Sequence, residues 1–266
     1  MAKQWSFFVA GAFTLLASCN SQPGAPSSAK PQATTDGKST ELAVAADVAA
    51  AKPEELRDGR YPARWWAAVP KEGAPDWEIL PQEAGPGEVI LSKRQADLGL
   101  LSNFAATPFE FHGKKYASLE GFWQAMKYPE GPDDARAKFP GLQWEHTRDE
   151  VAGMTAFDAK HAGDLGSANM KEMGIDWVTF EGKQMPYKPA EPGEHYKLIV
   201  AATWEKVRQN PDVKAALLST GDLTLRPDHH QEPDAAAAWK YYDILMGIRS
   251  QLQQENGAQP AGGDKK

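Results

Sequence analysis

The sequence predicts a single domain of the α+β class, mainly α with a small β element. Several long stretches repeat apolar residues at the three- and four-residue spacing of an amphipathic helix, whereas two-residue alternation is confined to short segments. The chain has 266 residues, of which 41% are hydrophobic and 10% aromatic. That is enough apolar material for one core with ordinary termini.

The strongest helical pattern lies at residues 194–209, and Asn210-Pro211 ends it. A shorter helix is expected after it, because Pro211 suits a first helical turn and Gly221 suits a C-terminal cap. One further helix is expected over 149–163, through Met154 and Phe157. Another is expected over 238–252, where one face carries Tyr241, Leu245, Ile248 and Leu252.

Strand signals are limited to two segments. Residues 88–93, "EVILSK", form a short apolar run, and Phe109 and Phe111 alternate with polar residues before a turn at His112-Gly113. The β element is therefore expected to be small.

The N-terminal residues have the anatomy of a secretory signal. Lys3 precedes an apolar run at 5–16, and small residues at 17 and 18 stand directly before Cys19, as in the lipobox of bacterial lipoproteins. We expect residues 1–18 to be a signal peptide and Cys19 to carry a lipid that anchors the protein in the bacterial cell envelope, facing outside the inner membrane. An uncleaved signal anchor, or a chance cysteine in an ordinary signal peptide, is the alternative.

Two segments contain little that forms a core. Residues 19–52 and 256–266 are rich in small and polar residues, and we expect a disordered tether and a disordered tail, respectively. The folded domain is then expected at 53–255. Three tryptophans in its first part are expected to pack over the core rather than bind a ligand: Trp65, Trp66 and Trp77.

Charge and cysteine content exclude some classes of function. The formal net charge is −7, whereas a protein that neutralises many phosphates by bulk attraction carries the opposite balance. Bulk nucleic-acid binding is therefore not expected. With Cys19 as the only cysteine, neither an intrachain disulfide nor a cysteine-based zinc cluster can form.

The stretch "YASLEGFWQAMKY" at 116–128 predicts a helix with two different faces. Ser118 suits the N-cap, which places Glu120 in the first turn. Leu119, Phe122 and Met126 share an apolar face, which we expect to be buried. A neighbouring polar ladder, which we expect to be displayed, consists of Glu120, Trp123, Gln124 and Lys127. Two interpretations stay open: a solvated helix face, or the wall of a site that stacks a base, binds a ribose and meets a phosphate.

The segment "LGLLSNFAATPFEFHGKKYASLEGFWQAMKY" resembles the signature of the YbiA-like or NADAR family. In that signature a Ser-Asn-Phe stretch and a Gly-containing turn precede a motif of the form S-x-E-x-[YF]-[FW]-Q-A-x-K. The resemblance continues through "NPDVKAALLSTGDLTL" to "ILMGIRSQL", so it covers roughly residues 88–252. The matching residues are Ser102, Asn103, Phe104, Ser118, Glu120, Phe122, Trp123, Gln124, Ala125 and Lys127.

The resemblance implies a mostly helical fold and an N-glycosidase that cleaves the C1′–N bond of a ribosyl compound. Family members act on ribosylamine intermediates of riboflavin synthesis or on ADP-ribosyl groups, and no cofactor is expected. By this resemblance Glu120 is the candidate that stabilises positive charge on the ribose or aims a water, in its ionised form. The substrate-binding candidates are Asn103 and Gln124 for hydroxyls, Phe104 and Trp123 for stacking, Lys127 for phosphate, and Trp239.

The loop "RPDHH" offers a candidate acid for the leaving group. Asp228 beside His229 would make an acid–base unit, and a surface pair of loop histidines is the alternative interpretation. A metal site is not expected there, because adjacent histidines rarely converge on one ion. His161 and His195, within helices, are expected to be structural.

Two hypotheses of different class follow. A lipoprotein works outside the cytoplasm, so an extracytoplasmic ADP-ribose or nucleoside conjugate is a better expected substrate than a riboflavin intermediate. The alternative is a non-catalytic ligand-binding or envelope-interaction lipoprotein. It is favoured by the segment before the last helix, which has Asp234 and Trp239 but not the family's Gly-rich loop.

Overall fold

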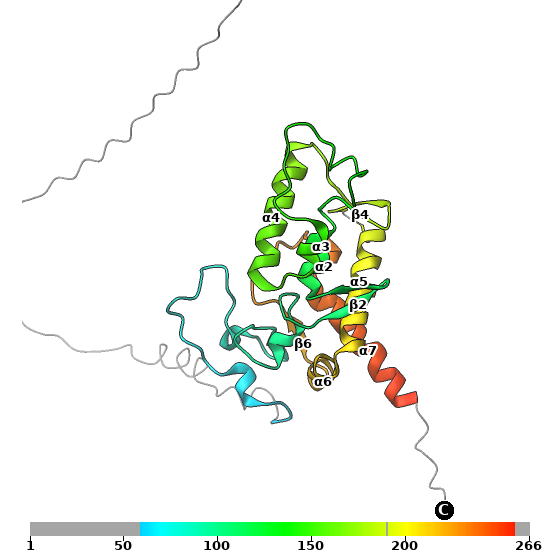
Figure 1. Ribbon diagram of the computed structural model, residues 1–266. Coiled ribbons are helices and arrows are strands. Elements are labelled where there is room, and N and C mark those ends of the chain that lie inside the picture. The colour runs from blue at the N-terminus through cyan, green and yellow to red at the C-terminus, as the bar shows by residue number, and fades with distance from the viewer. Residues whose placement is uncertain (1–58, 190, 259–266) are drawn as a thin grey trace, which may run out of the picture. The chain divides into compact units, whose positions relative to one another are not determined.

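The computed structural model describes residues 59–189 and 191–258, whose course is drawn in Figure 1. In this part of the chain the fold is α+β, as the sequence predicts, with six α-helices and three two-stranded sheets. The expected signal peptide, Cys19, the tether at 19–52 and the last eight residues of the expected tail lie outside the described residues.

The first part of the domain is built from short elements around two buried tryptophans. Trp65 and Trp66, in the 3₁₀ helix η2 (Ala63–Trp66), are 1% and 2% exposed, and the Trp65 indole donates to Asp97. Their expected packing over the core is confirmed. The elements that follow are η3 (Pro81–Glu83), β1 (Glu88–Ile90) and η4 (Leu98–Leu101).

Strand β1 pairs in parallel with β6 (Thr224–Arg226), which was not predicted, so that Val89 lies opposite Leu225. Both side chains are fully buried. The pairing joins two ends of the domain that are far apart in sequence. It also places the loop after β6, which contains Asp228 and His229, beside the segment that precedes β1: the backbone N–H of Ile79 donates to the Asp228 carbonyl at 2.9 Å.

The expected strand at Phe109 and Phe111 and the turn after it are present, and they form a hairpin of β2 (Phe109–Phe111) and β3 (Lys114–Tyr116). His112 and Gly113 have φ of +51° and +74°, the left-handed pair that a two-residue hairpin turn needs. A second hairpin was not predicted. It consists of β4 (Trp177–Phe180) and β5 (Lys183–Pro186), turned by Glu181-Gly182 in the same conformation.

Helix α2 (Leu119–Ala125) lies between α4 (Ala156–Glu172) and α5 (Glu194–Gln209), with α3 (Arg148–Ala152) beside it (Figure 1). Ser118 is its N-cap, as expected, and the Ser118 hydroxyl accepts from the backbone N–H of Gly121 at 2.9 Å. Gly121 is needed because a Cβ there would stand 2.5 Å from the Met154 carbonyl oxygen.

The expected single helix over 149–163 is wrong, because the chain breaks it into α3 and α4. The Met154 carbonyl does not continue a helix but accepts from the Ser118 hydroxyl at 2.9 Å. Ala156, at the start of α4, has φ of +49°. The contact with α2 therefore sets this break, which helical periodicity alone does not reveal.

The C-terminal helices follow the sequence pattern closely. Helix α6 (Pro211–Ser219) starts at Pro211, and Gly221 just beyond it has φ of +53°. The expected inner face of α7 (Tyr241–Ala258) is buried at Tyr241, Leu245, Ile248 and Leu252. The 3₁₀ helix η5 (Ala237–Trp239) precedes α7, which runs into the first residues of the expected tail.

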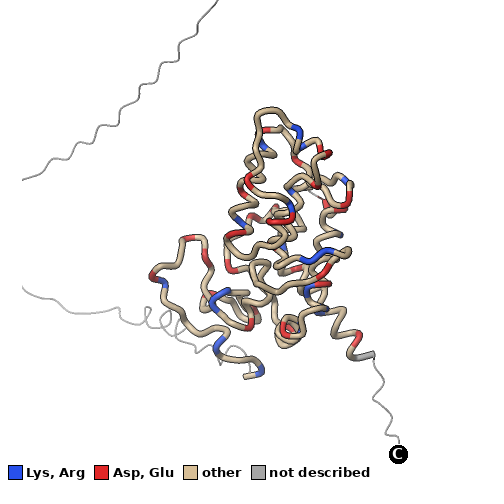
Figure 2. The backbone as a smooth tube through the Cα atoms, in the orientation of Figure 1, with Lys and Arg blue, Asp and Glu red and all other residues tan. Residues whose placement is uncertain are grey.

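Acidic and basic residues are interspersed along the described backbone, as Figure 2 shows. Within residues 59–189 and 191–258, no helix combines the length and apolarity that crossing a bilayer requires.

Candidate functional site

One cavity of about 560 Å³ is lined by every side chain that the sequence placed in a site. Its walls come from α2, α4, the loop at 102–104, the two residues after β5, the segment from β6 to the start of α7, and two residues on either side of β1, Trp77 and Lys93. The predicted catalytic residues on it are Glu120, Asp228 and His229, and the predicted binding residues are Asn103, Phe104, Trp123, Gln124, Lys127 and Trp239. The structure brings these residues together, while their roles stay predictions.

The polar ladder of α2 is buried, which corrects the expectation that it is displayed. Glu120 is 7% exposed, Trp123 5%, Gln124 7% and Lys127 4%, so the interpretation as a solvated helix face is wrong. The reason is that α4 packs on the polar side of α2 while the apolar side faces the aromatic core. Such burial of a carboxyl, an amide and an ammonium is costly unless each finds partners.

The ladder is close-packed against α4 at a glycine. A Cβ on Gly163 would stand 2.0 Å from Gln124 Oε1 and 2.2 Å from its Cδ, so only glycine leaves room for this amide. Gln124 donates from Nε2 to Glu120 Oε1 at 2.6 Å. Its own Oε1 is buried and has no hydrogen-bond partner among the described residues.

Burial raises the pKa of the Glu120 carboxyl, and the Gln124 hydrogen bond and the Lys127 charge lower it by less. This shift is opposite in direction to the one expected from the first-turn position of Glu120. A helix N-terminus contributes only a few tenths to about 1 kcal/mol at an exposed site, which does not offset nearly complete removal from water.

Lys127 is held within the protein instead of facing a phosphate. Its Nζ donates to the Gly163 carbonyl at 3.0 Å and to Ser167 Oγ at 2.8 Å, and it lies 5.0 Å from the centre of the Tyr187 ring. Burial lowers the pKa of Lys127 to about 8, and Glu120 and Asp164 act against this shift. Its role as a phosphate ligand is therefore not supported by its contacts.

The loop at 102–104 is tied to three helices by its backbone. The Asn103 carbonyl accepts from the N–H of Glu120 at 3.0 Å, and the Phe104 carbonyl accepts from the N–H of Ala156 at 3.2 Å. The Ser102 carbonyl accepts from Lys206 Nζ at 2.7 Å. Lys206 is 1% exposed, and burial lowers its pKa to about 7.

The aromatic wall is organised around Trp123. Its indole N–H donates to the Tyr187 hydroxyl at 3.1 Å, and the ring of His195 packs edge-on at 5.5 Å between centroids. His195 is buried without a hydrogen-bond partner on either nitrogen among the described residues, and burial lowers its pKa to about 4. His195 thus packs behind the wall, and His161 is exposed on α4; neither lines the cavity.

Asp228 and His229 form the side-chain pair that the sequence suggested, with 3.1 Å between Asp228 Oδ1 and His229 Nδ1. The His229 ring stacks on Tyr241 at 6.4 Å between centroids. Lys93 Nζ lies 3.8 Å from Asp228 Oδ2. In the part of the chain that the structure describes, no three His, Cys, Asp or Glu side chains group as metal ligands would.

Several residues that line the cavity were not predicted from the sequence. Lys160 and Asp164 are an ion pair on α4 at 2.6 Å, and Lys188 Nζ lies 4.6 Å over the ring of Trp239. The i,i+4 spacing of the first pair was visible in the sequence but reads equally as a solvated helix face. The remaining residues that were not predicted to bind ligand are Trp77, Lys93, Phe157, Ser167, Tyr187, His230, Gln231 and Tyr241, besides Ser102 of the family motif.

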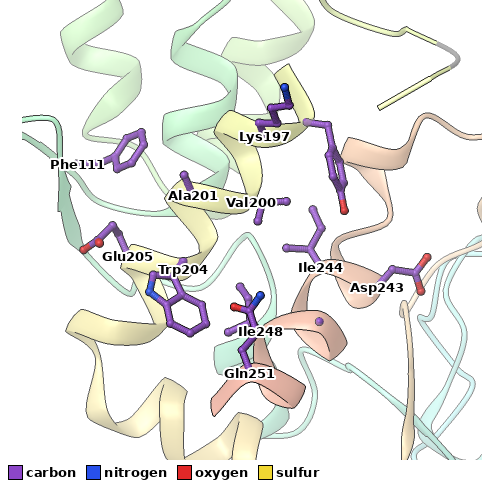
Figure 3. Close-up of a pocket in the computed structure, with 12 residues that line it drawn as sticks. Phe111, Lys197, Val200, Ala201, Trp204, Glu205, Asp243, Ile244, Ile248 and Gln251 are labelled. Atoms are coloured by element: carbon purple, nitrogen blue, oxygen red, sulfur yellow. The ribbon is translucent and has the colours of Figure 1, made fainter. Parts of the chain in front are cut away.

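A second hollow of about 590 Å³ lies between α5 and α7. Figure 3 shows Val200 of α5 and Ile244 of α7 pointing toward each other between the two helices. Most of its lining is aliphatic or aromatic, and its one carboxyl on α7, Asp243, has a pKa raised mainly by desolvation. It contains none of the predicted site residues.

Comparison with solved structures shows a likeness of fold to a known protein. The NMR structure of the E. coli protein YbiA matches with a TM-score of 0.42 and 20% sequence identity, over 65% of this chain and 88% of that one. No family model and no curated protein matches the chain. The likeness is one of fold alone, at a low level.

Proposed function

We propose that the cavity binds an N-ribosyl or ADP-ribosyl compound and hydrolyses its C1′–N bond. The observation that carries the proposal is Glu120, a buried carboxyl with a raised pKa on the wall of a cavity that also has aromatic, amide and ammonium groups. Perturbed carboxyls in clefts are typical of acid–base catalysts. The sequence resemblance to the YbiA-like family supports the same reaction class.

Glu120 suits the proton donor in this reaction. Departure of a nitrogen leaving group requires a proton, and a carboxyl whose pKa is raised by burial holds one closer to neutral pH. Once it has given the proton to the nitrogen, the carboxylate is stabilised by the Gln124 amide at 2.6 Å and by the Lys127 charge. It can then take a proton from the water that attacks C1′, which restores the acid.

The developing oxocarbenium ion needs negative charge nearby. Asp228 is the other carboxyl among the predicted catalytic residues. Carboxylates stabilise this transition state in glycoside hydrolysis. His229 holds Asp228 in place at 3.1 Å, and Tyr241 backs the imidazole. Glu120 and Asp228 therefore exchange the roles that the sequence suggested.

The proposed phosphate ligands are two lysines that are more exposed than Lys127. Lys160 and Lys188 both line the cavity, and Lys188 contacts the rings of Trp239 and Tyr187. A phosphate or diphosphate on the ligand would meet these ammonium groups without requiring Lys127 to leave Gly163 and Ser167.

The test is Glu120→Gln, which keeps the shape of the side chain and removes the proton. We expect binding of ribose 5-phosphate or ADP-ribose to change little, while turnover of an N-riboside falls at least a hundredfold. The matched control is Asp243→Asn, since Asp243 also has a raised pKa but lies in the α5–α7 hollow. Full turnover in Glu120→Gln refutes the catalytic role. Saturable binding without turnover in the unmodified protein supports the non-catalytic alternative.

The lipid anchor at Cys19 and a location outside the inner membrane complete the proposal. They rest on the sequence of residues 1–19 alone. They favour a substrate that reaches the cell envelope, such as a nucleoside or ADP-ribose conjugate, over an intermediate of cytoplasmic synthesis.

A further inference from the structure

Trp77 is an exposed tryptophan on the wall of the cavity. It was expected to pack over the core, but it is 45% exposed and lines the cavity that contains Glu120. It precedes residue 88, where the resemblance to the YbiA-like family begins, so this contribution to the cavity belongs to the chain's own N-terminal extension.

The backbone on either side of Trp77 is anchored. The N–H of His230 donates to the Trp77 carbonyl at 3.3 Å. The backbones of Glu78 and His229 form an isolated antiparallel β-bridge. The Glu78 carboxylate is fully buried and receives two bonds from Arg94, from Nε at 2.8 Å and from Nη2 at 2.7 Å. Such bidentate pairs fix geometry as well as position. The fold thus holds Trp77 in place while leaving much of its ring in water.

Lys93 lies against the same ring and connects it with the predicted catalytic loop. Its Nζ is 4.7 Å from the Trp77 ring centre, 3.3 Å from Glu78 Oε1 and 3.8 Å from Asp228 Oδ2. The cation orients the indole next to Asp228 without covering all of it.

A second exposed aromatic ring lies on the same cavity. Phe157, in the first turn of α4, is 58% exposed and packs edge-to-face on Phe104 at 5.3 Å between centroids. Among the described residues three large apolar side chains are exposed, and the third, Phe139, does not line this cavity. Exposed aromatic surface gathered at one hollow marks a binding surface.

We infer that Trp77 and Phe157 form an aromatic subsite at the opening of the cavity, which takes a planar heteroaromatic ring of the ligand beyond its ribosyl unit. The inference rests on the proposed function and adds to it the class of substrate. Stacking on an exposed indole favours flat rings over aliphatic groups, and rings of every base type offer a π face. The ring is either the group on C1′ itself or one at the far end of a phosphate linker.

The experiment compares ligands that differ by the ring, by calorimetric titration of the protein lacking residues 1–18. Ribose 5-phosphate has no ring, AMP has adenine on C1′, and ADP-ribose has adenine at the far end of a diphosphate. For Trp77→Ala we expect affinity for at least one ring-bearing ligand to fall about tenfold or more. Affinity for ribose 5-phosphate should stay within twofold. The ligand that loses affinity tells which position of the ring the subsite takes.

Three further variants make the outcome specific. Trp77→Phe keeps a flat ring and should retain most of the affinity, Phe157→Ala should repeat the selective loss, and Phe139→Ala should bind like the unmodified protein. Trp77→Ala should still unfold cooperatively at a melting temperature well above that of the titration, because its indole is 45% exposed and its backbone is held by other residues. This measurement separates lost binding from lost folding. Equal affinities of Trp77→Ala and the unmodified protein for all three ligands overturn the subsite while leaving the proposed function standing. Failure of the unmodified protein to bind any of them overturns both.

Discussion

Replacing Gly163 by alanine tests whether the contact between α2 and α4 builds the site. Alanine at an interior helical position is favoured over glycine by about 1 kcal/mol. Against this, the new Cβ would lie 2.0 Å from Gln124 Oε1, 2.2 Å from Cδ and 2.7 Å from Cγ, so the whole amide must move. Overpacking of this kind costs about 1–3 kcal/mol. Loss of the 2.6 Å hydrogen bond to Glu120 leaves buried polar groups unpaired, at about 1–3 kcal/mol more.

We therefore expect Gly163→Ala to lower the free energy of unfolding by about 1–5 kcal/mol, or the melting temperature by several degrees for a domain of this size. Gly247→Ala is the matched control, because Gly247 is also helical, in α7, and a Cβ there meets nothing within 4 Å. That control should stabilise by about 0.5–1 kcal/mol. Chemical and thermal unfolding followed by circular dichroism measure both.

A double substitution isolates the cause. In a Gln124→Ala background the space next to residue 163 is free, so adding Gly163→Ala should cost little there, and the two effects should be strongly non-additive. If Gly163→Ala is as stable as Gly247→Ala in the otherwise unchanged protein, the close contact between Gln124 and α4 is not as described. Simple additivity of the two substitutions would contradict the reasoning in the same way.

Two further predictions concern other parts of the chain. Burial lowers the pKa of Lys206 to about 7 from 10.5, so between these values the unfolded chain holds the extra proton and the stability of the unmodified protein rises with pH. In Lys206→Met residue 206 does not titrate, so this contribution to the pH dependence of stability is absent. The stability of this variant relative to the unmodified protein should be highest below pH 7 and should fall by up to about 1.4 kcal/mol per pH unit toward pH 10, measured by urea unfolding. Identical pH profiles would contradict the burial of a charged amine. Cys19→Ala should move the protein from the membrane fraction to the soluble fraction and abolish labelling by a lipid precursor, and persistent labelling would rule out acylation at this residue.

The elements that local rules determine were predictable from sequence. Ser118 caps α2, His112-Gly113 turns a hairpin, and Pro211 starts α6, because each depends on residues within a few positions along the chain. The β4–β5 hairpin had the same kind of local signal, Glu181-Gly182 after "WVTF", but it was not among the predicted strands.

Long-range contacts account for the features that the sequence did not reveal. The pairing of β1 with β6 and the break between α3 and α4 both depend on partners distant in the chain. Part of the cavity lining was predicted from the family motif and the "RPDHH" loop, but the environment of those residues was not. Helical spacing put Glu120 and Lys127 on one face, and only the tertiary structure shows that this face is buried against α4.

Burial of the ladder changes what the same residues do. In water, a first-turn glutamate and a nearby lysine would both be charged and weakly coupled. Between α2 and α4, removal of water pushes the pKa of Glu120 up and that of Lys127 down to about 8, while the two charges oppose both shifts. The balance depends on how closely α4 approaches, and Gly163 sets that approach. Gly163 therefore makes room for the Gln124 amide, which donates to the carboxyl of the proposed catalytic acid, Glu120.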